Sequence, residues 1–160
     1  MVTDAYSKKI VGWSLQETLQ SKGPIEAFKM ALSKYNDLKG LIHHSDRGIQ
    51  YCCLEYIKLL KNITISMTQD GDPGENAIAE RINGTIKNEF YCRGFLSLPL
   101  AQDGIAKAIY AYNYLRPHAS CDYLTPAQAH EMKGILNKRW SRNSTKKVVS
   151  TNTNNVSSTL

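Results

Sequence analysis

The segment 41–80 constrains the fold of this chain more than any other part of the sequence. It opens with a short apolar run that leads to Asp46. This pattern predicts a buried strand that carries a carboxylate to its exposed C-terminal end. A second carboxylate, Glu80, follows in a helical pattern after 33 residues (47–79). Two carboxylates that meet at a sheet edge can hold Mg²⁺ and form a phosphoryl-transfer site.

Each of these residues also has a structural explanation. Asp46 lies in a Ser-Asp-Arg-Gly turn sequence, where backbone N–H groups can satisfy the carboxylate. Glu80 lies on the polar face of a helical pattern, where most glutamates are solvated. Lys87 follows two turns later on that face and is equally suited to solvent or to a phosphate group. Spacing alone leaves both explanations open.

Strand patterns alternate with helical patterns along the chain. We expect a strand that ends at Thr3 and forms a hairpin with a second strand. The remaining elements are expected in order: a strand at 9–15, a helix at 24–35, a strand at 41–45, a helix at 54–60, a strand at 63–67, a loop at 68–74, helices at 75–91 and 100–114, and a short helix that begins at Thr125 and Pro126. This order predicts an α/β sandwich around a mixed sheet.

The helix predicted at 75–91 has an apolar stripe at steps of four residues. We expect this stripe to pack in the core and to be the buried face of the helix. Its residues are Ile78, Ile82, Ile86 and Phe90. The polar residues that fall away from it are Asn76, Glu80, Asn83 and Lys87. Glu80 is therefore predicted to point toward whatever the open face serves.

Composition adds a weak indication of the partner. The chain has 160 residues, enough for one domain with a core, and a formal net charge of +6. A polyanion such as nucleic acid is a plausible partner, and a merely basic soluble protein is the alternative. No segment resembles a signal peptide or a membrane span, so we expect a cytoplasmic protein. The four cysteines have no zinc-type spacing and are expected to be reduced and mostly buried.

Three long segments carry a family resemblance. HHSDRGIQY, SMTQDGDPGENAIAERINGTIKNEF and YNYLRPHASCDYLTPAQAHE resemble the catalytic domain of bacterial insertion-sequence transposases, within the retroviral-integrase-like superfamily. The resemblance covers roughly residues 2–131 and implies a ribonuclease H-like, three-layer α/β fold with an Asp-Asp-Glu site. We accordingly divide the chain into an incomplete integrase-like catalytic core at 1–133 and a basic, Ser/Thr/Asn-rich tail at 134–160, disordered from about residue 141.

The resemblance also implies roles for individual residues. Asp46 matches the second metal-binding Asp, Glu80 the metal-binding Glu, and Lys87 a basic residue that contacts DNA near the cleaved phosphate. Further candidates for DNA contacts are Asn83, Asn76, Arg47 and His44. The implied chemistry is DNA strand cleavage and joining with two Mg²⁺ (or Mn²⁺) ions in the intact family site. The implied partners are the ends of the insertion element, target DNA and further copies of the transposase, with no membrane.

Two departures from the family pattern bear on activity. The family's first catalytic Asp lies on a first, central strand upstream of the hairpin, and this chain starts too late to contain it. We do not expect Asp4 to substitute for it, because Asp4 matches the family's turn residue. Because the central strand is missing, we expect a gap or exposed edges in the sheet. The expected function is an impaired transposase catalytic domain; the alternatives are a non-catalytic remnant that at most binds DNA and an unrelated basic nucleic-acid-binding module.

The second departure is spacing. The family usually has about two more residues between the Asp and the Glu, a difference that costs little loop-closure entropy. The shortfall falls at 60–63, between a helix and a strand. It is either a benign shorter turn or a small deletion in a decaying gene.

Overall fold

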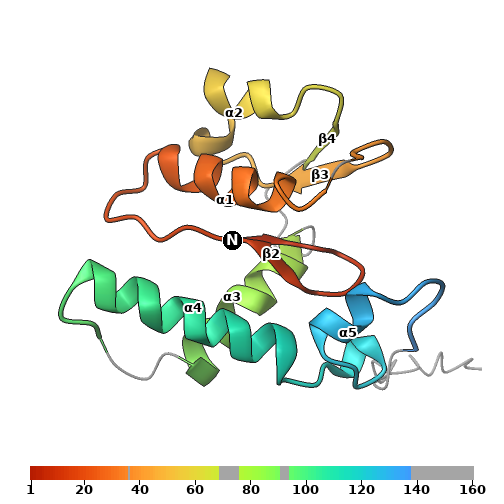
Figure 1. The fold of residues 1–160 in the computed structure, drawn as a ribbon. Coiled ribbons are helices and arrows are strands. Elements are labelled where there is room, and N and C mark those ends of the chain that lie inside the picture. The colour runs from red at the N-terminus through yellow and green to blue at the C-terminus, as the bar shows by residue number, and fades with distance from the viewer. Residues whose placement is uncertain (36, 69–75, 91–93, 138–160) are drawn as a thin grey trace, which may run out of the picture.

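The structure is a computed structural model that describes residues 1–35, 37–68, 76–90 and 94–137. Its elements follow the predicted order (Figure 1): β1 (Val2–Thr3), β2 (Ile10–Gly12), α1 (Lys22–Leu32), β3 (Ile42–Ser45), α2 (Leu54–Leu59), β4 (Thr64–Met67), α3 (Ala77–Phe90), α4 (Leu98–Tyr114) and α5 (Pro126–His130). Short 3₁₀ turns lie at Ile49–Tyr51 and Ala119–Cys121. The predicted tail from residue 141 and nearly all of the predicted loop lie outside the described residues.

The strands form two separate pairs. β1 and β2 make the expected antiparallel hairpin, although β2 is shorter than the predicted strand at 9–15. β3 and β4 pair in parallel, with Ile42 opposite Thr64 and Ser45 opposite Met67. Among the described residues no strand joins the two pairs. The mixed sheet of the expected fold is therefore divided, as the sequence predicts.

Two predictions of burial are wrong. The apolar start of the strand predicted at 41–45 is not buried, because Leu41 and Ile42 are 38% and 64% exposed, whereas Ser45 at its end is buried. In α3 the predicted stripe is buried at Ile82 and Ile86, but Ile78 is 40% exposed. All three exposed side chains line one cavity at the gap between the two strand pairs. The apolar pattern predicted burial because such side chains are normally covered by a neighbouring helix or strand. None of the described elements covers these three side chains.

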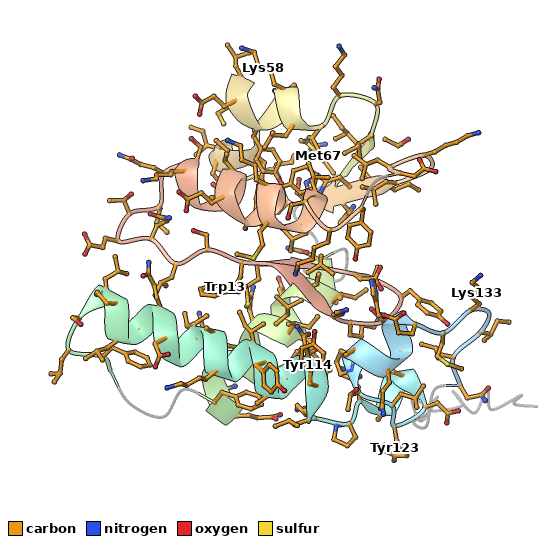
Figure 2. All side chains as sticks on the ribbon, viewed as in Figure 1. Trp13, Lys58, Met67, Tyr114, Tyr123 and Lys133 are labelled. Atoms are coloured by element: carbon orange, nitrogen blue, oxygen red, sulfur yellow. The ribbon has the colours of Figure 1, made fainter. Side chains whose placement is uncertain are left out.

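The hairpin lies between α1 on one side and α3 and α4 on the other (Figure 1). An apolar core lies on each side. In the first, Ile10 packs with residues of α3 and α4, namely Ile82, Ile86, Ile109 and Tyr112. Trp13 adds to this core and lies between the hairpin and α4 in Figure 2. On the other side α1 packs over α2 and the start of β4 through Ile25, Phe28, Tyr56, Leu60 and Ile63. Burial of each such side chain contributes roughly 1.5–3 kcal/mol.

The contact between β2 and α1 requires a glycine. A Cβ atom at Gly12 would lie 2.0 Å from the carbonyl oxygen of Ala27 and 2.9 Å from the amide nitrogen of Ala31. The small side chains of α1 and the absent side chain of Gly12 let the two backbones approach closely. This close approach allows α1 to pack directly against the hairpin.

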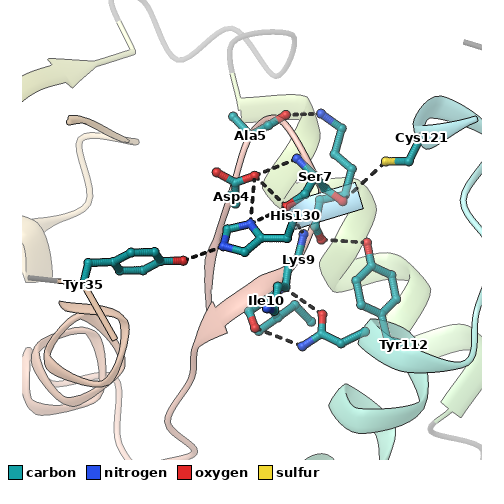
Figure 3. Close-up of polar contacts among 11 residues, drawn as sticks. Asp4, Ala5, Ser7, Lys9, Ile10, Tyr35, Tyr112, Cys121 and His130 are labelled. Carbon is teal, nitrogen blue, oxygen red and sulfur yellow. Dashed lines mark hydrogen bonds and ion pairs between the residues drawn. The ribbon is translucent and has the colours of Figure 1, made fainter. Parts of the chain in front are cut away.

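Side chains of α4 bind the hairpin backbone from the other side (Figure 3). The Asn113 side chain accepts a hydrogen bond from the Ile10 amide at 2.9 Å and donates one to the Ile10 carbonyl at 3.0 Å. The Tyr112 hydroxyl donates to the carbonyl of Lys8 at 3.1 Å. These bonds anchor the hairpin to α4.

The shortened connection at 60–63 closes in a tight turn. Leu60 ends α2, and its carbonyl accepts a hydrogen bond from the amide of Ile63 at 2.9 Å. Asn62 between them adopts a left-handed conformation, with φ of 69°, which asparagine tolerates better than most residues. The turn leads directly into β4. This geometry is what a benign shorter connection requires.

The predicted start of α5 is confirmed. Thr125 is the N-cap, Pro126 is the first helical residue, and Thr125 and Gln128 form a reciprocal capping box. Of the three cysteines described, Cys121 is buried, Cys53 is half-buried and Cys52 is exposed, so the expectation of mostly buried thiols is wrong for these residues. In the described part of the chain, no helix combines the length and apolar character needed to span a membrane.

Candidate active site

Asp46 lies directly after β3, where the sequence places it. Its side chain is exposed, and its carboxylate accepts a hydrogen bond from the amide of Gly48 at 2.9 Å. This bond is the turn interaction expected of an aspartate in Ser-Asp-Arg-Gly. Asp46 also lines the cavity at the sheet gap. The turn bond holds the residue beside this cavity and occupies only one carboxylate oxygen.

Glu80 lies in the first turn of α3 and is exposed, as predicted from the polar face of the helix. The residues one turn earlier, from Asn76 to Ala79, line the same cavity as Asp46. The end of β3 and the start of α3 therefore border one hollow. The position at a helix N-terminus favours negative charge, because unsatisfied backbone N–H groups give that end partial positive charge.

The other candidate DNA contacts lie on two elements. Asn83 and Lys87 are exposed on α3, away from its buried stripe. Lys87 follows Glu80 by seven residues, roughly 10 Å along the helix axis. Arg47 is exposed in the turn after Asp46. His44, on the exposed side of β3, shares a hydrogen bond with the Ser66 hydroxyl of β4 at 2.9 Å.

The two candidate carboxylates have the chemistry that Mg²⁺ prefers, and of the two only Asp46 lines the cavity. Asp46 and Glu80 offer hard carboxylate oxygens, and Mg²⁺ is commonly held by one or two carboxylates with water and phosphate as the other ligands. In the described ranges, no group of three or more His, Cys, Asp or Glu side chains is placed to hold a metal ion. The two candidate residues therefore suit a metal that shares its coordination with water or a nucleic-acid phosphate.

Asp4 lies in a different polar cluster (Figure 3). Its carboxylate accepts hydrogen bonds from the amide and the hydroxyl of Ser7, both at 2.6 Å. The Ser7 hydroxyl also lies 3.0 Å from Nδ1 of His130, whose Nε2 lies 2.8 Å from the Tyr35 hydroxyl. Because Ser7 donates its proton to Asp4, the Ser7 oxygen must accept from Nδ1–H of His130. Asp4 is a turn residue, as the sequence predicts.

This cluster has the residue types of a nucleophilic site, yet its geometry is structural. The Ser7 side chain is fully buried and its proton points to Asp4, so no substrate can reach the hydroxyl. The histidine and the tyrosine come from α5 and from the segment after α1. The cluster ties both to the hairpin. Sequence reasoning missed it, because no local pattern relates residues 4–7 to residue 130.

A second pair missed by sequence reasoning joins α3 to the end of α4. Arg116 donates hydrogen bonds to Glu89 through Nε at 2.6 Å and Nη2 at 2.7 Å. These bonds hold the pKa of Glu89 below its usual value. Both side chains are partly exposed, so water screens the pair and its contribution to stability is modest. The pair helps to fix the helix that bears Glu80 and Lys87.

Comparison with known proteins identifies the family. Two models described as "Integrase core domain" match residues 1–73 and 61–126. The transposase for insertion sequence element IS904 of Lactococcus lactis is 35% identical over 127 residues, covering 77% of this chain and 50% of the relative. Transposase InsF for insertion sequence IS3A of Escherichia coli is 31% identical over 132 residues, covering 80% of this chain and 46% of the relative.

The fold agrees with these matches. The catalytic core domain of HTLV-2 integrase, solved in complex with magnesium, superposes with a TM-score of 0.60 at 28% identity and covers 80% of each chain. The chain spans about half the length of the curated relatives it matches. It therefore belongs to the integrase core domain family, with insertion-sequence transposases among its relatives.

Proposed function

We propose that this chain is part of the catalytic core of a bacterial transposase that cleaves and joins DNA strands in the cytoplasm with divalent metal. The observation that carries the proposal is the shared cavity. Asp46, directly after β3, and the residues that immediately precede Glu80 at the start of α3 line the same hollow. The family membership of the chain supports this assignment.

The charge of each side chain sets its proposed role, with the carboxylates binding metal and the lysine binding DNA phosphate. Asp46 and Glu80 would hold Mg²⁺ or Mn²⁺, which in two-metal sites polarises phosphate oxygens and stabilises the leaving oxygen. Lys87, on the same face of α3, would bind a DNA phosphate and set the position of the strand. Asn76, Asn83, Arg47 and His44 would add contacts to the backbone or to bases. The ends of the element and the target are the proposed DNA partners.

This chain by itself offers two carboxylates where the family motif uses three. We therefore propose that strand transfer by the isolated chain is impaired, whereas binding of metal and DNA persists. The alternative is a non-catalytic remnant that at most binds DNA. Multimers are proposed by analogy with the HTLV-2 integrase core, which was solved in trimeric and dimeric forms.

A metal-binding experiment tests the site independently of activity. Mn²⁺ added to the purified chain should broaden the NMR signals of residues near Asp46 and Glu80. Asp46→Asn and Glu80→Gln should each weaken this effect at least about tenfold, because each removes a charged oxygen ligand. Glu55→Gln, which removes an exposed carboxylate on α2, is the matched control. Equal binding by all variants would rule out this site.

A DNA assay separates the two functions. The chain is incubated with Mg²⁺ or Mn²⁺ and duplexes that carry the ends of the element. Cleavage or joining that is lost in Asp46→Asn supports the enzyme. DNA binding without any strand chemistry, in the parent and the variant alike, supports the remnant.

A further inference from the structure

We propose that an open hollow around Gly84, on the exposed surface of α3, binds the phosphate backbone of a DNA strand. This contact is separate from the metal site and from Lys87. Arg81 would supply the positive charge of the hollow, and Thr85 and Asn88 would supply neutral hydrogen-bond donors. The inference rests on the proposed function in one respect, since it takes DNA to be the partner of the chain.

The hollow follows one face of the helix. Its volume is about 270 Å³, and the described residues that line it are Arg81, Gly84, Thr85, Asn88 and Glu89. Positions 81, 84, 85 and 88 have the spacing of side chains that share a helix face. The line 81, 84, 88 is displaced by one residue from Glu80, Asn83 and Lys87, which turns it by about 100° around the helix axis. The hollow and Lys87 therefore lie on neighbouring faces of α3.

Gly84 leaves the helix backbone bare at the middle of the hollow. Apart from its chain neighbours and the backbone of α3, no described atom lies within 4 Å of a Cβ atom built at this position. Packing within the described structure therefore does not require a glycine here. A glycine inside a helix costs roughly 0.5–1 kcal/mol relative to alanine, and it lets a ligand approach the backbone closely. Close approach of a phosphate group would use this property.

The hollow can accept an anion although a carboxylate lines it. Both oxygens of Glu89 accept hydrogen bonds from Arg116, at 2.6 and 2.7 Å, so the charge of this carboxylate is neutralised. Arg81 is exposed and takes part in none of the ion pairs in the part of the chain that the structure describes. Its guanidinium group, which suits phosphate oxygens in geometry and charge, is free to bind one.

Positive charges from two other segments reinforce the field at this surface. Burial lowers the pKa of His118, and nearby positive charges lower it further. These charges belong to Arg116, Lys8 and Arg81, and Glu89 opposes them. The hairpin turn, α3 and the segment after α4 therefore bring three cations close to one imidazole. Cations gathered on one surface attract a polyanion, most strongly at low salt.

The chemistry of the hollow favours a DNA backbone over a protein partner. Arginine, threonine and asparagine side chains are common donors to phosphate oxygens in complexes with DNA. Among the described residues, no apolar side chain lines the hollow, whereas the centre of a protein interface is normally apolar and often aromatic. The hollow also lies on the helix that bears Glu80 and Lys87. DNA held by Lys87 would need only to extend around α3 to reach it.

The first test measures the affinity of the full 160-residue chain for a labelled duplex by fluorescence anisotropy. Arg81→Gln should weaken binding about five- to tenfold and lower the slope of log affinity against log salt by about 1. Asn88→Ala should weaken binding about threefold, because it removes a neutral donor. Lys58→Gln is the matched control: it also removes one exposed positive charge, from α2, well away from α4 in Figure 2. Binding to this control should change by less than about twofold.

A third substitution fills the hollow without a change of charge. Gly84→Leu places a bulky side chain over the bare backbone and should weaken DNA binding about fivefold. Leucine is a better helix former than glycine, so circular dichroism should show a folded chain of equal or higher stability. A loss of binding in this variant would therefore come from the filled hollow and not from unfolding.

A direct readout comes from NMR on the parent chain. The side-chain N–H signals of Arg81 and Asn88 should shift as the duplex is added. A duplex whose phosphates are replaced by uncharged methylphosphonate linkages should leave both signals in place, because the proposed contact is to charged phosphate oxygens. This measurement needs no variant and is independent of the fold of any mutant.

The outcomes separate this site from the proposed function. If the parent binds the duplex but Arg81→Gln and Lys58→Gln weaken it equally, the net charge of the chain explains binding and the hollow is not a site. If the duplex leaves the signals of Arg81 and Asn88 unmoved while Lys87→Ala weakens binding, DNA contacts α3 only on the face of Lys87. If the parent binds no DNA at all, this site and the proposed DNA partner are both wrong.

Discussion

The side-chain amide of Asn113 in α4 hydrogen-bonds both main-chain groups of Ile10 in β2, although the two residues lie 103 positions apart in the chain. An amide side chain presents the same donor and acceptor as a peptide group, so it satisfies this point of the strand as a neighbouring strand would. Asn113 is 5% exposed and Ile10 is 2% exposed. The contact therefore replaces water at a buried stretch of backbone.

Removal of this contact should be costly. Asn113→Ala leaves the N–H and the C=O of Ile10 buried without partners, and we expect a loss of about 2–4 kcal/mol in the free energy of unfolding. Urea denaturation followed by circular dichroism measures it. Asn88→Ala, an exposed asparagine on α3, is the control and should change stability by less than about 0.5 kcal/mol. Similar losses in both variants would contradict the role of Asn113.

The contact between β2 and α1 gives a second prediction. Gly12→Ala places a Cβ atom 2.0 Å from the carbonyl oxygen of Ala27, so the helix must move away from the strand. We expect a destabilisation of about 3 kcal/mol, because the neighbours are backbone atoms that cannot rotate away. Gly84→Ala in α3 is the matched control. Apart from its chain neighbours and the backbone of α3, no described atom lies within 4 Å of its added Cβ, and better helix propensity should stabilise the chain by about 0.5–1 kcal/mol.

Helices and strands could be predicted from the sequence because each depends on neighbours within a few positions. The stripe at Ile82 and Ile86 repeats at helical spacing, and the caps at Thr125 and Pro126 act on the first turn of their own helix. Burial is different. Ile42 lies in an apolar run that predicts a buried strand, yet it is exposed, because burial depends on what pairs with the strand.

Only part of the candidate site could be predicted from the sequence. Asp46 and Glu80 were found from the motifs that contain them, and the structure sets the elements that bear them around one cavity. The turn bond from Gly48 to Asp46 follows from local sequence. The cluster of Ser7 and His130 could not be found in this way, since its partners lie 123 positions apart and a buried hydroxyl leaves no periodic signal.

Stability should fall as the pH drops below 6.5. Burial lowers the pKa of His43, and the charge of His44 lowers it further. Burial also lowers the pKa of His118, with Arg116 as the next cause. Between each lowered pKa and about 6.5 the unfolded chain takes up protons that the folded chain does not. The stability that these two histidines contribute is therefore fully present above about 6.5 and declines below it.

Thermal unfolding between pH 7.5 and 5.5 measures this decline. His43→Gln should flatten the slope, because the amide nitrogen or oxygen can still bond the Tyr56 hydroxyl that His43 Nε2 bonds at 3.0 Å, but the side chain takes up no proton. The lowered pKa of Glu89 has its effect below about pH 4.5, outside this range. An unchanged slope in His43→Gln would assign the pH dependence to other groups.

DNA binding should depend on salt and on the exposed face of α3. Because Lys87 would neutralise a phosphate, Lys87→Ala should lower the affinity for duplex DNA and reduce the slope of log affinity against log salt by about 1. Fluorescence anisotropy with a labelled duplex at several salt concentrations measures both. Lys107→Ala is the matched control, because Lys107 is also an exposed helical lysine but forms an ion pair with Asp103 at 2.7 Å on α4. Equal changes in both variants would show that binding depends on the net charge of +6 and not on this face.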